Sequence, residues 1–179
     1  MSSKSHLRHI SLRHRSREIA LQLIYQLDIR PSANVEEVIE LYFTEDDAKN
    51  SDEVIVLYPS VDEVENIHEL TELYLSEDEA EEVFDYACEL VKGVCDNIDA
   101  ISDLLRENII GWRPERMVAV DKVAISIALY EGIISKKVPV AVSISEAVVL
   151  AKIFGTAESG RFVNGVLGRI VRKEEPPLN

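Results

Sequence analysis

The chain has 179 residues, of which 46% are hydrophobic and 29% are charged, and its formal net charge is −14. This length suits one domain or two small ones, and the composition is that of a globular protein with a real core. No apolar run reaches the ~18 residues that a membrane span needs. The basic N-terminus lacks the apolar core of a signal peptide, so nothing in it indicates export. We therefore expect a cytoplasmic protein that does not bind membranes.

The charge is distributed unevenly along the sequence. Residues 1–30 carry six Lys or Arg against two acids, residues 31–90 carry one Lys against twenty acids, and residues 91–179 carry twelve against eleven. Such asymmetry is more informative than the total. A small basic segment on an acidic body indicates one polyanion-binding patch and argues against a protein that coats nucleic acid.

The first elements follow from composition and helical periodicity. Residues 1–12 are rich in Ser, His and Arg without a clear period, and we expect a flexible basic arm. Residues 13–29 place their apolar side chains on one side of a helix, and Pro31 ends it. Asn34 with an acid three residues later predicts a capped helix to about residue 43.

The middle of the chain changes character at an acidic stretch. Residues 44–76 are acidic and interrupted, and we expect a partly ordered insertion there. Ser76 with Glu79 predicts a capping box before a strong helix over residues 77–96. Asn97 is predicted to cap the helix that follows.

The last third of the chain predicts the centre of the fold. Pro114 suits the first turn of a helix to about residue 135 that is apolar on most sides, which is typical of the middle of a bundle. Ser143 with Glu146 predicts a second capping box, and the helix it opens ends at Gly155.

A final helix over residues 157–172 contains two glycines, Gly165 and Gly168, which destabilise a helix unless they permit close packing. We expect close packing there and a disordered tail over residues 174–179. Strand signals are scarce, so the predicted fold is all-α, with residues 13–173 forming two small helical bundles around the long central helix.

Side chains that hold metals or cofactors are few and poorly spaced. Cys88 and Cys95 lie seven residues apart in a helical pattern, which fits two small buried groups in a reducing compartment. His6, His9 and His14 lack a fourth ligand and an ordered frame. We expect no metal and no cofactor.

The segment 155–162 (GTAESGRF) invites comparison with a phosphate-binding loop. That loop needs Lys where this chain has Arg161 and Ser or Thr where it has Phe162, and it follows a strand rather than a helix. We interpret the segment as a tight turn between helices. No Ser–His or Cys–His pair has sequence support, so we expect no enzyme; a nucleotide-dependent enzyme is the weaker alternative.

The basic N-terminal segment is the best candidate for a binding site. It contains no acid before Glu18. Arg13 and Arg17 are one helical turn apart, so both can face one phosphate track, and guanidinium groups bind phosphate in bidentate fashion. Arginine-rich segments that become ordered on RNA are a known mode of recognition. A solvated, disordered terminus remains the alternative from composition alone.

Several segments together resemble the NusB family of transcription antitermination factors. The first is RHRSREIALQLIY at residues 13–25. The most specific are VSISEAVVLAKIFGT at 142–156 and SGRFVNGVL at 159–167. Further similarity lies at residues 91–94, 97, 112, 120–122 and 127–131. The order and spacing of these pieces, more than any one of them, carry the resemblance.

The resemblance implies a NusB fold and a function without catalysis. It implies binding of boxA-type RNA together with the ribosomal protein NusE, with indirect contact to other Nus factors and RNA polymerase, in support of ribosomal RNA transcription and processing. A homodimer is also known among family members. The positions implied for RNA binding are Arg13, His14, Arg15, Arg17, Gln22, Arg161 and Phe162. Those implied for NusE binding are Tyr25 and Asp121.

This chain departs from the family pattern in two places. His14 and Ser16 interrupt the arginine-rich start, and we predict RNA binding that strengthens as His14 becomes protonated. The insertion 44–76 has no recognised counterpart. The rival interpretation is an adaptor of the same fold that binds a protein but no RNA; such an adaptor would lose no RNA affinity on deletion of residues 1–17.

Overall fold

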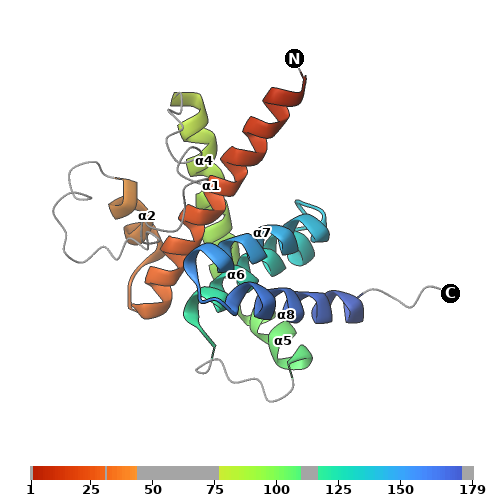
Figure 1. The fold of residues 1–179 in the computed structure, drawn as a ribbon. Coiled ribbons are helices and arrows are strands. Elements are labelled where there is room, and N and C mark those ends of the chain that lie inside the picture. Colours follow the sequence, from red (N-terminus) through yellow and green to blue (C-terminus); the bar gives the residue numbers. More distant parts are fainter. Residues whose placement is uncertain (1, 31, 44–76, 110–116, 175–179) are drawn as a thin grey trace.

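The computed structural model describes residues 2–30, 32–43, 77–109 and 117–174 (Figure 1). Every regular element in these ranges is helical, as predicted. They are α1 (Ser2–Ile29), α2 (Val35–Phe43), α4 (Glu77–Asp96), α5 (Ile98–Asn108), α6 (Ala119–Leu129), the π-helical η3 (Tyr130–Ile134), α7 (Val140–Phe154) and α8 (Ser159–Glu174). The predicted insertion, the capping role of Ser76, the helix start at Pro114 and most of the predicted tail lie outside the described residues.

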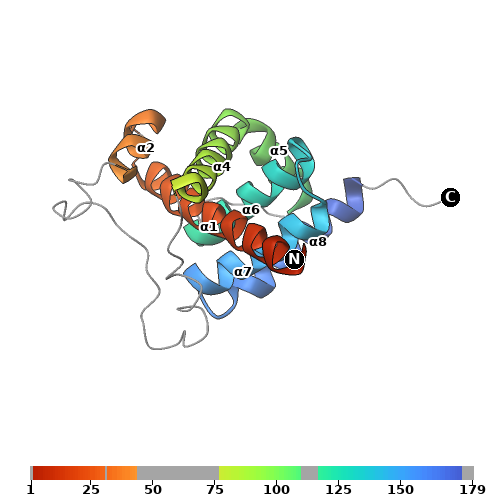
Figure 2. The same cartoon turned by 90° about the horizontal axis from the view of Figure 1, so that it is seen from above.

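Helix α6 is the centre of the molecule, as its sequence predicts. Its residues 123–129 are all buried, and it packs against α1, α4, α5, α7 and α8. Helix α1 packs most extensively on α4 and also on α2, whereas α7 packs on α8 and α6. Figures 1 and 2 show these two groups of helices meeting around α6, which confirms the expected pair of small bundles.

The structure differs from the prediction at the N-terminus. Helix α1 begins at Ser2, so residues 2–12, which we expected to form a flexible arm, continue the first helix. No Pro or Gly interrupts residues 2–29, and a helix without a breaker extends by one hydrogen bond per residue. The N-terminal ends of α1 and α4 project from the same side of the molecule (Figure 1).

Three of the predicted helix caps lie within the described residues. The Asn34 side chain accepts a hydrogen bond from the Glu36 amide at 2.8 Å, which confirms that Asn34 caps α2. Asn97 makes no such bond; its amide instead donates to the Gly93 carbonyl at the end of α4. The predicted cap at Ser143 is also wrong, because α7 begins at Val140, after Pro139.

The predicted central helix is also interrupted. The α-helical pattern ends at Leu129, and one π-helical turn, η3, follows it. A π-turn inserts an extra residue into the helical ladder and redirects the side chains beyond it.

Cys88 and Cys95, both on α4, are free thiols that form no disulfide, and both are half-buried.

The glycines of α4 and α8 differ in how closely other residues pack against them. A Cβ atom on Gly93 of α4 would overlap the ring of Tyr130, so this position brings α4 against η3. A Cβ on Gly165 of α8 would have no neighbour within 4 Å. A Cβ on Gly168 would meet only the Arg172 side chain of the same helix, at 3.4 Å. The expectation of close packing at Gly165 and Gly168 is therefore wrong.

Substitution of Gly93 and Gly165 by alanine should have opposite effects. Gly93→Ala should lower the free energy of unfolding by about 1–3 kcal/mol, because an overpacked core must shift. Gly165→Ala should raise it by about 0.4–1 kcal/mol, because the unfolded chain loses freedom without strain in the helix. Urea unfolding followed by circular dichroism measures both. Equal stability of Gly93→Ala and the wild type would contradict the packing.

Candidate nucleic-acid interface

Arg17 lies in the interior where α1 meets η3 and α7. Its side chain is 4% exposed. The Nε atom donates to both Glu131 oxygens at 3.1 and 3.0 Å, and Nη2 donates to Glu131 Oε1 at 2.7 Å. A third nitrogen, Nη1, lies 3.3 Å from Glu146 Oε2. Burial of a charge is tolerated only with such pairing, so Arg17 fixes how α1 is seated on the rest of the fold.

Tyr86 of α4 joins this ion pair. Its hydroxyl donates to Glu131 Oε1, and its ring lies under the Arg13 guanidinium, 3.8 Å from Cζ to the ring centroid. The Arg17 guanidinium is farther away, at 5.9 Å from the same centroid. Burial and the hydrogen bond to Glu131 raise the pKa of Tyr86, so the hydroxyl stays a donor.

His14 occupies the rim of the same junction. Its Nδ1 lies 2.7 Å from Glu146 Oε2 and its Nε2 lies 3.6 Å from Glu18 Oε1. Burial opposes the charge on His14, but the Glu146 and Glu18 carboxylates outweigh it and raise the pKa of His14 above 6.5. Burial also opposes ionisation of Glu146, yet His14 and Arg17 lower the pKa of Glu146 below 4.5.

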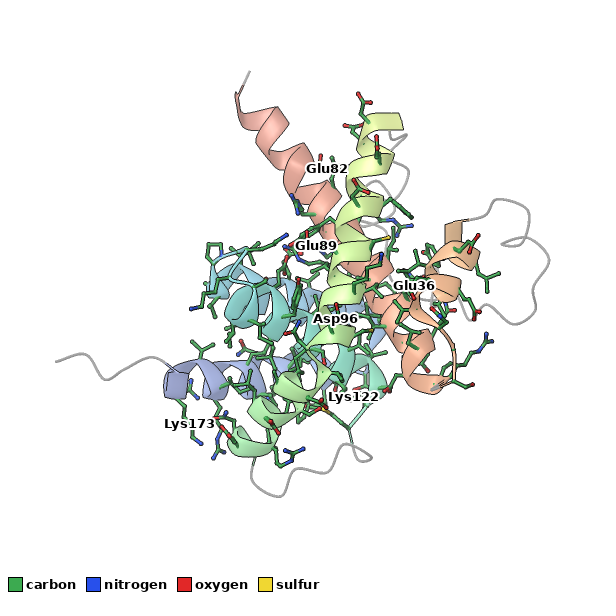
Figure 3. The ribbon with its side chains drawn as sticks, turned by 180° about the vertical axis from the view of Figure 1, so that it is seen from behind. Glu36, Glu82, Glu89, Asp96, Lys122 and Lys173 are labelled. Atoms are coloured by element: carbon green, nitrogen blue, oxygen red, sulfur yellow. The ribbon has the colours of Figure 1, made fainter. Side chains whose placement is uncertain are left out.

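Two arginines of this turn reach the surface. The side chains of Arg13 and Arg15 are 35% and 37% exposed. Arg13 Nε lies 3.8 Å from Glu82 Oε1, at the level where α1 and α4 approach each other (Figure 3). Arg15 Nη1 contacts Glu18 Oε2 at 3.0 Å. Both side chains are partly exposed to solvent, so they can contact an anionic ligand.

The structure divides the predicted RNA-binding set. It brings Arg13, His14 and Arg15 together on one turn of α1. Arg13 and Arg17 do approach the same ring, but Arg17 is buried and each of its three guanidinium nitrogens pairs with a carboxylate, so the two do not share an open phosphate track. Gln22 is 2% exposed and accepts a hydrogen bond from the Tyr42 hydroxyl at 3.4 Å.

Arg161 and Phe162 lie on a different surface, at the start of α8. This helix packs on α7, α6 and α5, and α5 lies on the opposite side of the molecule from the projecting end of α1 (Figure 1). Phe162 is 41% exposed. A groove of about 500 Å³ lies between α5 and α8, and its lining includes these two residues with Asn108, Ile109, Arg169 and the acidic Glu158.

Tyr25 and Asp121 lie where the end of α1 meets the start of α6. Lys122 Nζ contacts Asp28 Oδ1 across this junction. Tyr25 is half-buried and Asp121 is 4% exposed. Burial raises the pKa of Asp121, although the Ser159 hydroxyl opposes the shift. The exposed Ile29 adds an apolar side chain to this end of α1.

Sequence reasoning missed the residues that hold the basic turn in place: Tyr86, Glu131 and Glu146. One signal was available, because Glu131 is the one charged residue in the stretch 123–134, which is otherwise mostly apolar, and a buried carboxylate needs a cation. Among the described residues, no group of three or more His, Cys, Asp or Glu could hold a metal. None of the described helices is long and apolar enough to cross a membrane.

Comparison with known proteins gives consistent results. The model of the NusB family matches residues 14–172. The transcription antitermination protein NusB of Carboxydothermus hydrogenoformans is 30% identical over 158 residues, which is 88% of this chain and 91% of that protein. NusB of Desulforudis audaxviator is 44% identical over 94 residues, 52% of this chain and 68% of that protein.

Solved structures share the fold. T. maritima NusB matches with a TM-score of 0.64 and 26% identity, over 92% of this chain and 93% of that one. A complex of antitermination factors NusB and NusE with double-stranded RNA matches with a TM-score of 0.63 over 90% of this chain and 97% of that one. Its identity is 22%, so this likeness concerns the fold alone.

Loss of the buried arginine should be far more damaging than loss of its exposed neighbour. Arg17→Met should lower the free energy of unfolding by about 3–5 kcal/mol, because it leaves Glu131 buried without its cation. Arg15→Met, two residues away and half-exposed, should lower it by less than about 1 kcal/mol. Urea titration of both variants makes the comparison. Similar losses for the two would show that Arg17 is not structural.

The contribution of His14 to stability should depend on pH. Since the folded-state pKa of His14 is raised above 6.5, its stabilisation is complete below that pH and is lost as pH rises through the raised value. His14→Gln should therefore be destabilised relative to the wild type at about pH 6 and much less so at about pH 9. Urea unfolding at both values tests this. A difference that is constant with pH would exclude the ion pair with Glu146.

Proposed function

Because the chain belongs to the NusB family, we propose that it binds boxA-type RNA together with the ribosomal protein NusE, as an antitermination factor that supports ribosomal RNA transcription and processing. The observation that carries the proposal is the turn of α1 that presents Arg13, His14 and Arg15 on a frame held by the buried Arg17. The shared fold with a NusB–NusE–RNA complex supports it.

RNA contact is assigned here to the half-exposed residues of α1, with Arg17 and Gln22 as supports behind them. The α8 groove is the second RNA surface of the proposal. There Phe162 offers an aromatic face for base stacking, and Arg161 and Arg169 offer positive charge, which is the combination that single-stranded nucleic acid recognition uses. The remainder of the chain is acidic enough to give the whole sequence a net charge of −14, and it repels RNA from other surfaces.

NusE is assigned to the junction of α1 with α6, where the half-buried Tyr25 would contact it and the buried Asp121 would lie behind the contact surface. The exposed Ile29 and Val118 flank this junction in sequence and are 41% and 43% exposed, so an apolar contact area is available to a protein partner. Contact with other Nus factors and RNA polymerase would then be indirect. The raised pKa of His14 shifts the proposed pH dependence of RNA binding upward, because the side chain keeps its charge above pH 6.5.

The adaptor without RNA binding is the competing proposal. Deletion of residues 1–17 does not separate the two functions cleanly, because it removes the buried Arg17 along with the surface arginines. Substitution of single exposed arginines avoids this problem.

A matched pair of arginine variants tests the proposed function. Labelled boxA-like RNA is titrated at several salt concentrations, with and without NusE, using Arg15→Ala and Arg106→Ala. Both arginines pair with an acid three residues earlier or later on their own helix. Arg15→Ala should weaken binding and lower the salt slope by about one, whereas Arg106→Ala should change neither.

The adaptor makes the opposite prediction for the same titration. If the chain is such an adaptor, the wild-type protein would bind NusE but would bind no RNA, even at low salt. Equal effects of the two substitutions would show that the RNA responds to overall charge and not to the α1 surface.

A further inference from the structure

The contact between Arg13 and Tyr86 does not use the N–H donors of the arginine, one of which, on Nε, faces Glu82 at 3.8 Å. A guanidinium group stacks through its flat face, while its N–H donors lie at the edges of the plane. Arg13 Cζ lies 3.8 Å from the Tyr86 ring centroid, and its side chain is 35% exposed. The stack therefore holds the group in place without using the donors that a phosphate would need.

The ring that supports Arg13 is itself fixed. Tyr86 is 4% exposed and is therefore enclosed by its neighbours. Its hydroxyl donates to Glu131 Oε1, and Glu131 is 1% exposed and held by Arg17. Rotation of the ring would break a buried hydrogen bond and leave a carboxylate oxygen with one fewer donor, which is unfavourable. Tyr86 is thus a rigid base for a residue that is otherwise long and flexible.

Arg15 provides a contrast on the same turn. Its exposure, 37%, is close to that of Arg13. It pairs with Glu18 on its own helix, at 3.0 Å, and among the described residues no aromatic ring lies beneath its guanidinium group. The two arginines therefore differ in how they are held and hardly in how accessible they are.

We propose that Tyr86 is a positioning residue for the RNA-binding surface: its ring, fixed by Glu131, holds the Arg13 guanidinium with its N–H edges available to an RNA phosphate. The inference rests on the proposed function. Tyr86 does not itself touch the RNA, because it is buried. Holding Arg13 in advance reduces the side-chain freedom that is lost on binding, which improves affinity without adding a contact. Glu82, 3.8 Å from Arg13 Nε, is the group that the phosphate displaces.

A double-mutant cycle on the full chain tests the proposal. Tyr86→Leu should weaken binding of labelled boxA-like RNA about two- to fivefold, the range of an exposed cation–π contact. The same substitution should have no further effect in an Arg13→Ala background. It should keep its full effect in an Arg15→Ala background, which is the matched control. A general disturbance of the fold would weaken binding equally in both backgrounds.

Two milder variants keep the test decisive if Tyr86→Leu does not fold. Tyr86→Phe retains the ring beneath Arg13, so its RNA affinity should stay close to that of the wild type. Arg13→Lys retains the charge but loses the planar group, so it should weaken binding about two- to fivefold while the salt slope stays unchanged. Urea unfolding of each variant monitors the fold.

The outcomes separate this inference from the proposed function. Two results would overturn the positioning role alone. In one, the wild type binds RNA and Arg13→Lys binds it equally well. In the other, Tyr86→Leu still weakens RNA binding in the Arg13→Ala background. Absence of RNA binding by the wild type, with and without NusE, would overturn both.

Discussion

The pairing of Arg17 with Glu131 is the interaction on which the rest of the structure depends. A buried arginine is very unfavourable unless each of its donors finds an acceptor, and here three nitrogens meet two carboxylates from two other segments. This requirement permits only one position and rotation of α1 on the core. The orientation of α1 in turn decides which neighbours of Arg17 face solvent, and it places Arg13, His14 and Arg15 at the edge of the buried junction.

One helical turn thereby serves two purposes. Successive residues on a helix point about 100° apart, so a run of basic residues cannot all face the same way. The residue that faces inward becomes structural, and those at the rim keep exposed charge. The acidic composition elsewhere in the chain strengthens this division, because an anionic ligand is attracted only where basic side chains reach the surface.

The sequence predicts local features of this protein well and long-range ones poorly. Helix α2 and its cap at Asn34 follow from neighbouring residues, and α4 follows from apolar periodicity. Ser143 and Glu146 have the spacing of a capping box, but α7 begins earlier and Glu146 pairs with residues 132 and 129 positions away. Likewise the inward role of Arg17 depends on Glu131, 114 residues away. No local pattern contains such partners.

The π-helical turn explains how so many of these contacts converge. Three consecutive residues in it reach three different elements. Tyr130 packs against Gly93 of α4, Glu131 binds Arg17 of α1 and Tyr86 of α4, and Gly132 leaves room only for the Ser143 side chain of α7. A regular α-helix would send the side chains beyond Leu129 in other directions. The extra residue of the π-turn is therefore what lets the central helix join both bundles at the point where the basic turn is anchored.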